Sequence, residues 1–240
     1  MFDEEKNRLE ADPESSFIGN RAFLRLFQLI SPYLPVGAFS YSQGLEWAVQ
    51  AGWVNGEKGA KEWIFGTLSH SLSKLEIPVL ARLYKAWENQ DRLSLKTWAK
   101  FLNASRESKE LREEDRQMGT ALARLLFDLQ VKEAEEWRVD PDANFPLLFS
   151  LASVCWKIPL RAAGEGYAWA RVENQVISGV KLIPLGQTSA QKILSEAAYW
   201  ISDCVDSGLK LKDEEIGFFA PGFAMASALH ETLYSRLFRS

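Results

Sequence analysis

The sequence predicts an all-α fold, a single compact helical domain of about nine or ten helices with a flexible N-terminal arm. Apolar residues recur at helical rather than alternating spacing in most segments, and no pair of strand-like runs is joined by a tight hairpin signal. No repeat period and no Ser/Gly-rich linker divides the 240 residues. We therefore expect an arm over residues 1–20 and one helical domain over 21–240.

The arm is expected because residues 1–20 are acidic and polar and show no periodicity. The run that follows at 31–46 crowds prolines, glycines, aromatics and uncharged polar groups together. Pro32 and Pro35 restrict their own backbone and that of the preceding residues, while Gly37 permits a conformation that a side chain would forbid. We therefore expect the run 31–46 to form a rigid surface of defined shape.

The helices are expected from their apolar faces and their end signals. Ser40 and Gln43 form a capping box that would open one helix, and Thr188 and Gln191 form another. Pro78 would lie in the first turn of its helix, where the missing N–H costs little. The expected helices cover 40–50, 57–73, 77–89, 93–105, 106–130, 145–156, 159–180, 188–208 and 218–237.

Composition excludes several classes of protein. The net charge is -4, and lysines and arginines are interleaved with acidic residues, so the basic stripe of a nucleic-acid binder is missing. Cys155 and Cys204 are in no metal or redox spacing, which is typical of reduced cytosolic thiols. The N-terminus does not resemble a signal peptide, and the most apolar stretch, 145–156, is too short to cross a bilayer. We expect a cytoplasmic protein that binds neither nucleic acid nor a membrane.

No catalytic or metal site is expected. His70 and His230 each lack a second ligand at metal-binding spacing, and we interpret them as helix-surface or interface histidines. Ser40 and Ser42 lie in a glycine-flanked run without the spacing of a nucleophile elbow, and helix capping explains them better. The chain also lacks a phosphate-binding Gly-Lys loop. The expectation is a non-enzymatic chain with no catalytic residue, metal site or cofactor.

Each of three further segments can be interpreted as purely structural, and two of them can also be interpreted as interaction surfaces. The charged run 106–116 offers mixed-sign pairs such as Lys109 with Glu113 and Arg112 with Asp115, which indicates either a solvated helix face or a docking surface. The loop 179–188 is interpreted as a packed interhelical connection. The ending 230–240 combines aromatic and apolar groups with arginines, which favours either an interface or a terminal helix packed on the core.

Four segments together resemble the UreF family of urease accessory proteins. They are the run 29–46 with Leu-Pro-Val-Gly-Ala-Phe-Ser-Tyr-Ser-Gln-Gly-Leu-Glu, the segment 105–122, the loop 181–188 with Pro-Leu-Gly-Gln-Thr, and the ending Tyr-Ser-Arg-Leu-Phe-Arg-Ser. They lie in the order that the family shows. The resemblance implies an all-helical, cytosolic homodimer that acts as a scaffold and co-chaperone in nickel insertion into apo-urease. Its partners would be the accessory protein UreD/UreH and the GTPase UreG.

The resemblance also implies which residues bind partners. The tail that engages UreD/UreH is matched by Tyr234, Arg236, Leu237 and Phe238. The candidates for a shaped partner surface are Tyr41, Gln43, Glu46, Arg112, Asp115, Arg116, Lys181 and Gln187. Two alternatives stay open: a regulator of the UreG GTPase, to which Arg112 or Arg116 would supply positive charge, and a direct nickel carrier.

Overall fold

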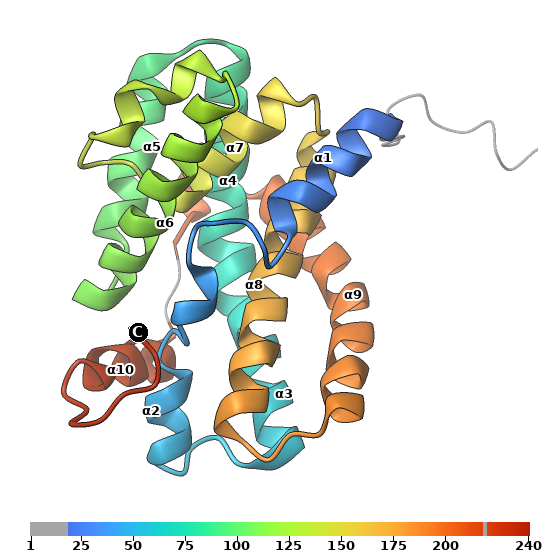
Figure 1. Ribbon diagram of the computed structural model, residues 1–240, viewed down its shortest axis with the longest axis vertical. Helices are drawn as coiled ribbons and strands as arrows, with labels where there is room; N and C mark the ends of the chain where they lie inside the picture. Colours follow the sequence, from blue (N-terminus) through green and yellow to red (C-terminus); the bar gives the residue numbers. More distant parts are fainter. Residues whose placement is uncertain (1–18, 218–219) are drawn as a thin grey trace, which may run out of the picture.

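The computed structural model describes residues 19–217 and 220–240, which form ten α-helices and no strand (Figure 1). The all-α prediction is confirmed. The helices are α1 (Asn20–Ile30), α2 (Leu45–Gln50), α3 (Gly56–Thr67), α4 (Ile77–Glu88), α5 (Arg92–Ala104), α6 (Lys109–Asp128), α7 (Phe145–Cys155), α8 (Leu160–Leu182), α9 (Gln187–Lys210) and α10 (Pro221–His230). Most of the predicted arm, residues 1–18, lies outside the described residues.

Helix α8 joins the two ends of the molecule. It packs along α9 and also contacts α1, α2, α3, α4 and α7. At the other end, α5 and α7 pack on α4, and α6 packs on α7 (Figure 1). The last helix, α10, lies against α2 and the N-terminal part of α6, so the C-terminus returns to the segment that follows the first helix.

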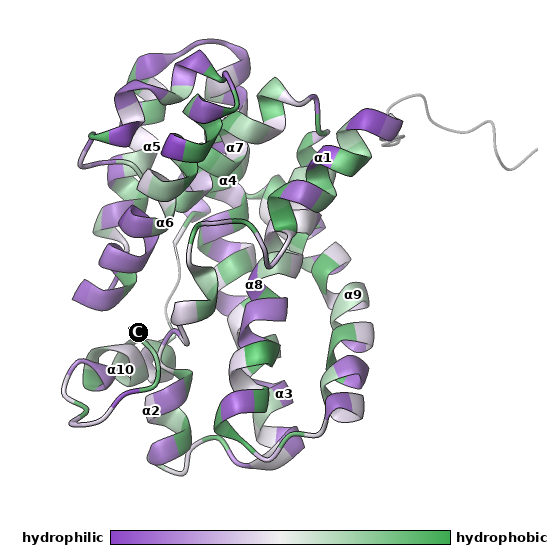
Figure 2. Ribbon diagram, in the orientation of Figure 1, coloured by the Kyte–Doolittle hydropathy of each residue, from purple (hydrophilic) through white to green (hydrophobic). Residues whose placement is uncertain are grey.

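Helix α7 is buried along most of its length, as the apolar run 145–156 predicted. Every residue from Phe145 to Ser153 is buried, and the ribbon is green over most of this helix in Figure 2. Asn144 caps it, because its side-chain oxygen accepts a hydrogen bond from the Leu147 amide at 3.1 Å. The pattern of hydrophobicity and the cap therefore agree on this core element.

Two helices predicted as separate are continuous. A π-helix over Leu68–Glu76 joins α3 to α4 without a break. Pro78 lies at the start of α4 as expected, and it has no N–H to donate to the carbonyl of Lys74. That carbonyl accepts instead from the Gly217 amide at 3.0 Å. A long-range hydrogen bond thus satisfies the group that the proline leaves free.

Both predicted capping boxes are wrong. Residues Ala38–Ser40 form a short 3-10 helix, and α2 begins only at Leu45. Gln43 adopts a left-handed backbone with φ of 56°, whereas the third helical residue of a capping box has to be in the right-handed helical conformation. Helix α9 begins at Gln187, with Gly186 rather than Thr188 at its N-cap. In each case a glycine takes the boundary position, Gly44 for α2 and Gly186 for α9.

Two terminal segments also differ from expectation. No helix was predicted over 20–30, yet α1 forms there and buries Ala22, Leu26 and Leu29 on one face. The helix predicted over 218–237 ends at His230, and residues 218–219 lie outside the described part of the chain. Residues 231–240, called the tail from here on, leave the helix and run back over the 40–46 turn.

A substitution at Gly119 tests how closely α6 packs on Asn144, the residue that caps α7. A Cβ at this position would lie 2.5 Å from the carbonyl carbon of Asn144, so backbone would have to move. We expect Gly119→Ala to lower the free energy of unfolding by about 1–3 kcal/mol in urea denaturation. Gly66→Ala is the matched control, because an added Cβ there meets nothing within 4 Å and helix propensity favours alanine. Equal stabilities for the two variants would contradict this packing.

Candidate partner-binding surface

The turn before α2 is shaped by left-handed residues. Gly37, Gln43 and Gly44 have φ of 77°, 56° and 82°. At Gly44 a Cβ would also lie 2.8 Å from the backbone nitrogen of Ser227 in α10. The glycine is therefore required twice, by its backbone conformation and by the close approach of α10.

Glu46 is the main acceptor for the tail. Its side chain is buried in α2, where Oε1 accepts from the Leu237 amide at 2.7 Å and Oε2 from the Phe238 amide at 2.9 Å. The next amide, of Arg239, donates to the carbonyl of Ser40 at 2.8 Å. Hydrogen bonds to a carboxylate are stronger than those between neutral groups, so this one side chain fixes the path of the tail.

The tail ends inside the same turn. The main-chain oxygen of Ser240 accepts from the Ser42 amide at 2.7 Å and from its hydroxyl at 2.6 Å. The Ser240 hydroxyl donates to Glu114 Oε2 at 2.9 Å. The other oxygen of Glu114 accepts from the side-chain amide Nε2 of Gln43 at 2.6 Å. Glu114 therefore links the left-handed turn, the tail and helix α6.

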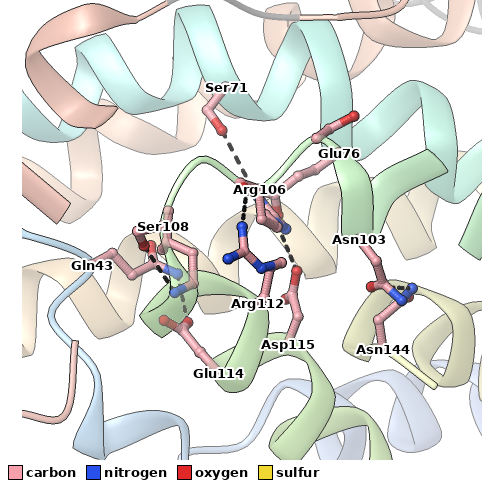
Figure 3. A network of polar contacts seen from close by, with 12 residues as sticks. Gln43, Ser71, Glu76, Asn103, Arg106, Ser108, Arg112, Glu114, Asp115 and Asn144 are labelled. Carbon is pink, nitrogen blue, oxygen red and sulfur yellow. Dashed lines mark hydrogen bonds and ion pairs between the residues drawn. The ribbon is translucent and has the colours of Figure 1, made fainter. Parts of the chain in front are cut away.

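Behind Glu114 lies a buried cluster of ion pairs, part of which Figure 3 shows. Arg106 donates to Asp115 Oδ2 at 2.6 Å and to Glu76 Oε1 at 3.1 Å. Arg171 donates to Glu114 Oε1 at 3.0 Å, and its Nε lies 3.5 Å from Glu76 Oε2. These side chains are 10% exposed or less, so each charge depends on its partner rather than on water.

The two arginines set the ionisation of this cluster. Burial would raise the pKa of Glu76, but Arg171 and Arg106 outweigh it and hold that pKa at about 2. Burial raises the pKa of Glu114 and of Asp115, although the arginines oppose it. Since the pKa of Glu76 is lowered on folding, its contribution to stability is present above the ordinary carboxyl range and is lost as pH falls toward about 2.

A second polar group joins α10 and the tail to α6. His230 contacts Glu46 Oε2 through Nε2 at 3.1 Å and Glu110 Oε2 through Nδ1 at 2.7 Å. Arg236 donates to the other oxygen of Glu110 at 2.5 Å. Glu231 accepts from the Lys109 amide at 2.8 Å, which satisfies a free N–H at the start of α6.

The structure brings most of the predicted site residues to this region but buries several of them. The buried ones are Tyr41, Gln43, Glu46, Asp115 and Phe238, and the exposed ones are Arg112, Arg116, Lys181, Gln187, Tyr234, Arg236 and Leu237. Lys181 lies 5.4 Å from the centre of the Phe238 ring, and the Tyr41 hydroxyl donates to Gln117 at 2.7 Å. Gln187 begins α9, at the loop that follows α8.

Of the two ion pairs predicted along α6, one is confirmed and one is wrong. Lys109 and Glu113 form the expected ion pair at 3.8 Å. Arg112 does not pair with Asp115 but donates to the main-chain oxygen of Arg106 at 2.8 Å, as Figure 3 shows. Asp115 points into the interior and pairs with the buried side chain of Arg106. A carboxylate removed from water is stable only next to an opposite charge, and Arg106 supplies it.

Several residues of this region were missed by sequence reasoning. Glu110, Glu114 and Arg171 were not singled out, and His230 was interpreted only as a surface or interface residue. Glu76 carried a usable signal, since it interrupts the apolar run Leu75-Glu76-Ile77-Pro78-Val79. A charge within such a run indicates a buried ion pair.

The fold and this region form a helical framework against which the tail folds back and is held by hydrogen bonds. In the described part of the chain, no group of three or more His, Cys, Asp or Glu could hold a metal ion. None of the helices that the structure describes is long and apolar enough to span a membrane.

Comparison with known proteins gives the family. The UreF family model matches residues 54–198. The urease accessory protein UreF of Alkalilimnicola ehrlichii is 53% identical over 216 residues, which cover 90% of this chain and 95% of that protein. The UreF proteins of Hahella chejuensis and Pseudomonas putida strain W619 are 45% and 47% identical, each over 91% of this chain and 98% of the relative. The chain belongs to the UreF family of urease accessory proteins, as its motifs indicated.

Glu46 provides the first test of this region. Glu46→Ala leaves the Leu237 and Phe238 amides without their acceptor, so we expect the tail to detach and trypsin to cleave after Arg236 at least tenfold faster, as judged by intact mass. Glu113→Ala is the control, because its pair with Lys109 is on the surface. Equal cleavage of the two variants would show that Glu46 does not hold the tail.

Arg171 tests the buried cluster. Arg171→Met removes the partner of Glu114 and one of the two arginines beside Glu76, and we expect it to lower the free energy of unfolding by about 3–5 kcal/mol. Arg161→Met is the control, since Arg161 is 40% exposed where it pairs with Glu165 and Asp206 and should cost no more than about 1 kcal/mol. Urea denaturation measures both. A loss at Arg171 as small as that at Arg161 would contradict the role of the cluster.

Proposed function

We propose that the chain is a non-catalytic scaffold and co-chaperone in the maturation of the urease nickel centre. In this proposal it bridges the accessory protein UreD/UreH and the GTPase UreG on apo-urease, with nickel as the cargo. It acts in the cytoplasm as a homodimer, as the family resemblance implies. Membership of a family of urease accessory proteins supports the pathway, and the docked tail supports the scaffold role.

The observation that carries the proposal is the division of the tail into anchoring and displayed residues. Phe238 and Ser240 are buried against the body. Tyr234 is fully exposed, Leu237 is 65% exposed, and Arg236 lies between them in sequence. Tyrosine and arginine are the residues that most often carry interface energy, and a backbone already fixed by Glu46 loses little entropy on binding.

The displayed tail borders a polar cleft of about 500 Å³. The cleft is lined by Tyr41, Lys109, Glu110, Glu113, Gln117, Glu231, Arg236, Phe238 and Arg239. Arg112 and Arg116 are exposed on α6, the helix that supplies four of these residues. We assign the tail to UreD/UreH and propose that the exposed face of α6 extends the surface on which the assembled complex receives UreG.

Capture of purified UreD/UreH by the tagged chain tests the assignment. The double variant Tyr234→Ala/Leu237→Ala removes only exposed side chains, so we expect at least tenfold weaker binding with unchanged circular dichroism and melting temperature. Tyr199→Ala is the matched control, because Tyr199 is a similarly exposed aromatic on α9. Undiminished capture by the double variant would refute the tail as the UreD/UreH site.

A further inference from the structure

His230 is held between two carboxylates in the interior of the protein. Its side chain is 0% exposed at the end of α10. Nε2 lies 3.1 Å from Glu46 Oε2, and Nδ1 lies 2.7 Å from Glu110 Oε2. Both ring nitrogens therefore lie within hydrogen-bond distance of a carboxylate oxygen, one on α2 and one on α6.

This arrangement requires a particular protonation state. A neutral imidazole has one N–H, so it can donate to only one of the two carboxylates. Each carboxylate also accepts hydrogen bonds from other donors, as a carboxylate rather than a carboxylic acid does best. Glu46 accepts the Leu237 and Phe238 amides, and Glu110 accepts from Arg236. Both contacts are hydrogen bonds only when the His230 ring is the imidazolium.

The charges around the ring fit that state. Glu46 faces it from α2, Glu110 from α6, and Arg236 reaches Glu110 from the tail. The remaining charged neighbour, Glu231, accepts from the Lys109 amide at the start of α6. When the ring is protonated, the positive charges of His230 and Arg236 balance the negative charges of Glu46 and Glu110. Without the proton, a ring lone pair faces a carboxylate in a buried site, which is unfavourable.

We propose that His230 is a proton-dependent lock on the tail. The protonated ring ties Glu46 to Glu110, the two carboxylates that also hold Arg236, Leu237 and Phe238. As pH rises the ring loses its proton, one of the two contacts becomes repulsive, and the tail leaves the 40–46 turn. The stabilisation of the closed tail is thus present at low pH and is lost as pH rises.

The lock acts on the tail and leaves the core folded. The buried cluster of Arg106 and Arg171 includes neither His230 nor its two carboxylates. The tail contacts it through the Ser240 hydroxyl on Glu114, which keeps its hydrogen bonds from Arg171 and Gln43 when the tail leaves. In the cell, release would change which side chains of residues 231–240 are displayed to a partner. The inference rests on the geometry of this chain alone, so it stands or fails independently of the urease assignment.

Two NMR signals in the full chain test the lock between about pH 5 and 8. Ring ¹⁵N shifts report the protonation of His230, and the chain's second histidine, His70, is assigned by His70→Gln. The ¹⁹F signal of fluorinated Phe238, assigned by Phe238→Leu, reports the tail, while the buried Phe65, Phe145 and Phe149 report the core. We expect the Phe238 signal to move to its free position as the His230 ring loses its proton, with the core signals unchanged. A tail that stays bound to a neutral His230 ring would overturn the proposal.

Two variants separate the lock from a general weakening. His230→Gln cannot carry the charge, so we expect a free tail at every pH, whereas His70→Gln should behave as wild type because His70 is exposed. Glu110→Gln can donate its amide N–H to an unprotonated Nδ1 while its oxygen still accepts from Arg236. We expect Glu110→Gln to keep the tail closed at high pH. Wild-type pH dependence in His230→Gln, or release of the tail by Glu110→Gln at high pH, would overturn the proposal.

Discussion

The tail is held by three carboxylates from two helices, and the proposed partner-binding surface depends on them. Glu46 in α2 accepts two consecutive tail amides, Glu110 in α6 accepts from Arg236, and Glu114 in α6 accepts the Ser240 hydroxyl. A ten-residue segment outside any helix has few hydrogen bonds of its own, and ordering it costs conformational entropy. Charge-assisted hydrogen bonds to fixed carboxylates offset that cost and also set the direction of the chain.

Of these three carboxylates, Glu114 is fixed by the interior. Glu114 shares Arg171 with Glu76, and Asp115 on the next position of α6 is held by Arg106. These charges come from the π-helix, the connection between α5 and α6, α6 and α8, so the positions of these segments are coupled to one another. Buried ion pairs are costly to break by removing one partner, which gives this region a single arrangement rather than many.

The sequence was sufficient to predict the helical framework but not the 40–46 turn or the hydrogen bonds that hold the tail. Helices with long apolar faces, such as α6, α7 and α8, were predicted within one to three residues at each end because their periodicity is local. The turn at 40–46 was misassigned because Gln43 and Gly44 take their conformations from contacts with Glu114 and α10, far away in sequence. For the same reason, local spacing paired Asp115 with Arg112 rather than with Arg106. Composition drew attention to the tail but did not show that Phe238 and Ser240 are buried.

Residue-resolved amide hydrogen exchange of the wild-type chain tests most directly whether the body holds its own tail. The amides of Leu237, Phe238 and Arg239 donate to Glu46 and Ser40, whereas Tyr234 and Ser235 lie in the exposed part of the tail. We expect the first three amides to exchange at least a hundredfold more slowly than the other two. Exchange of all five at the rate of an unfolded peptide would contradict the account.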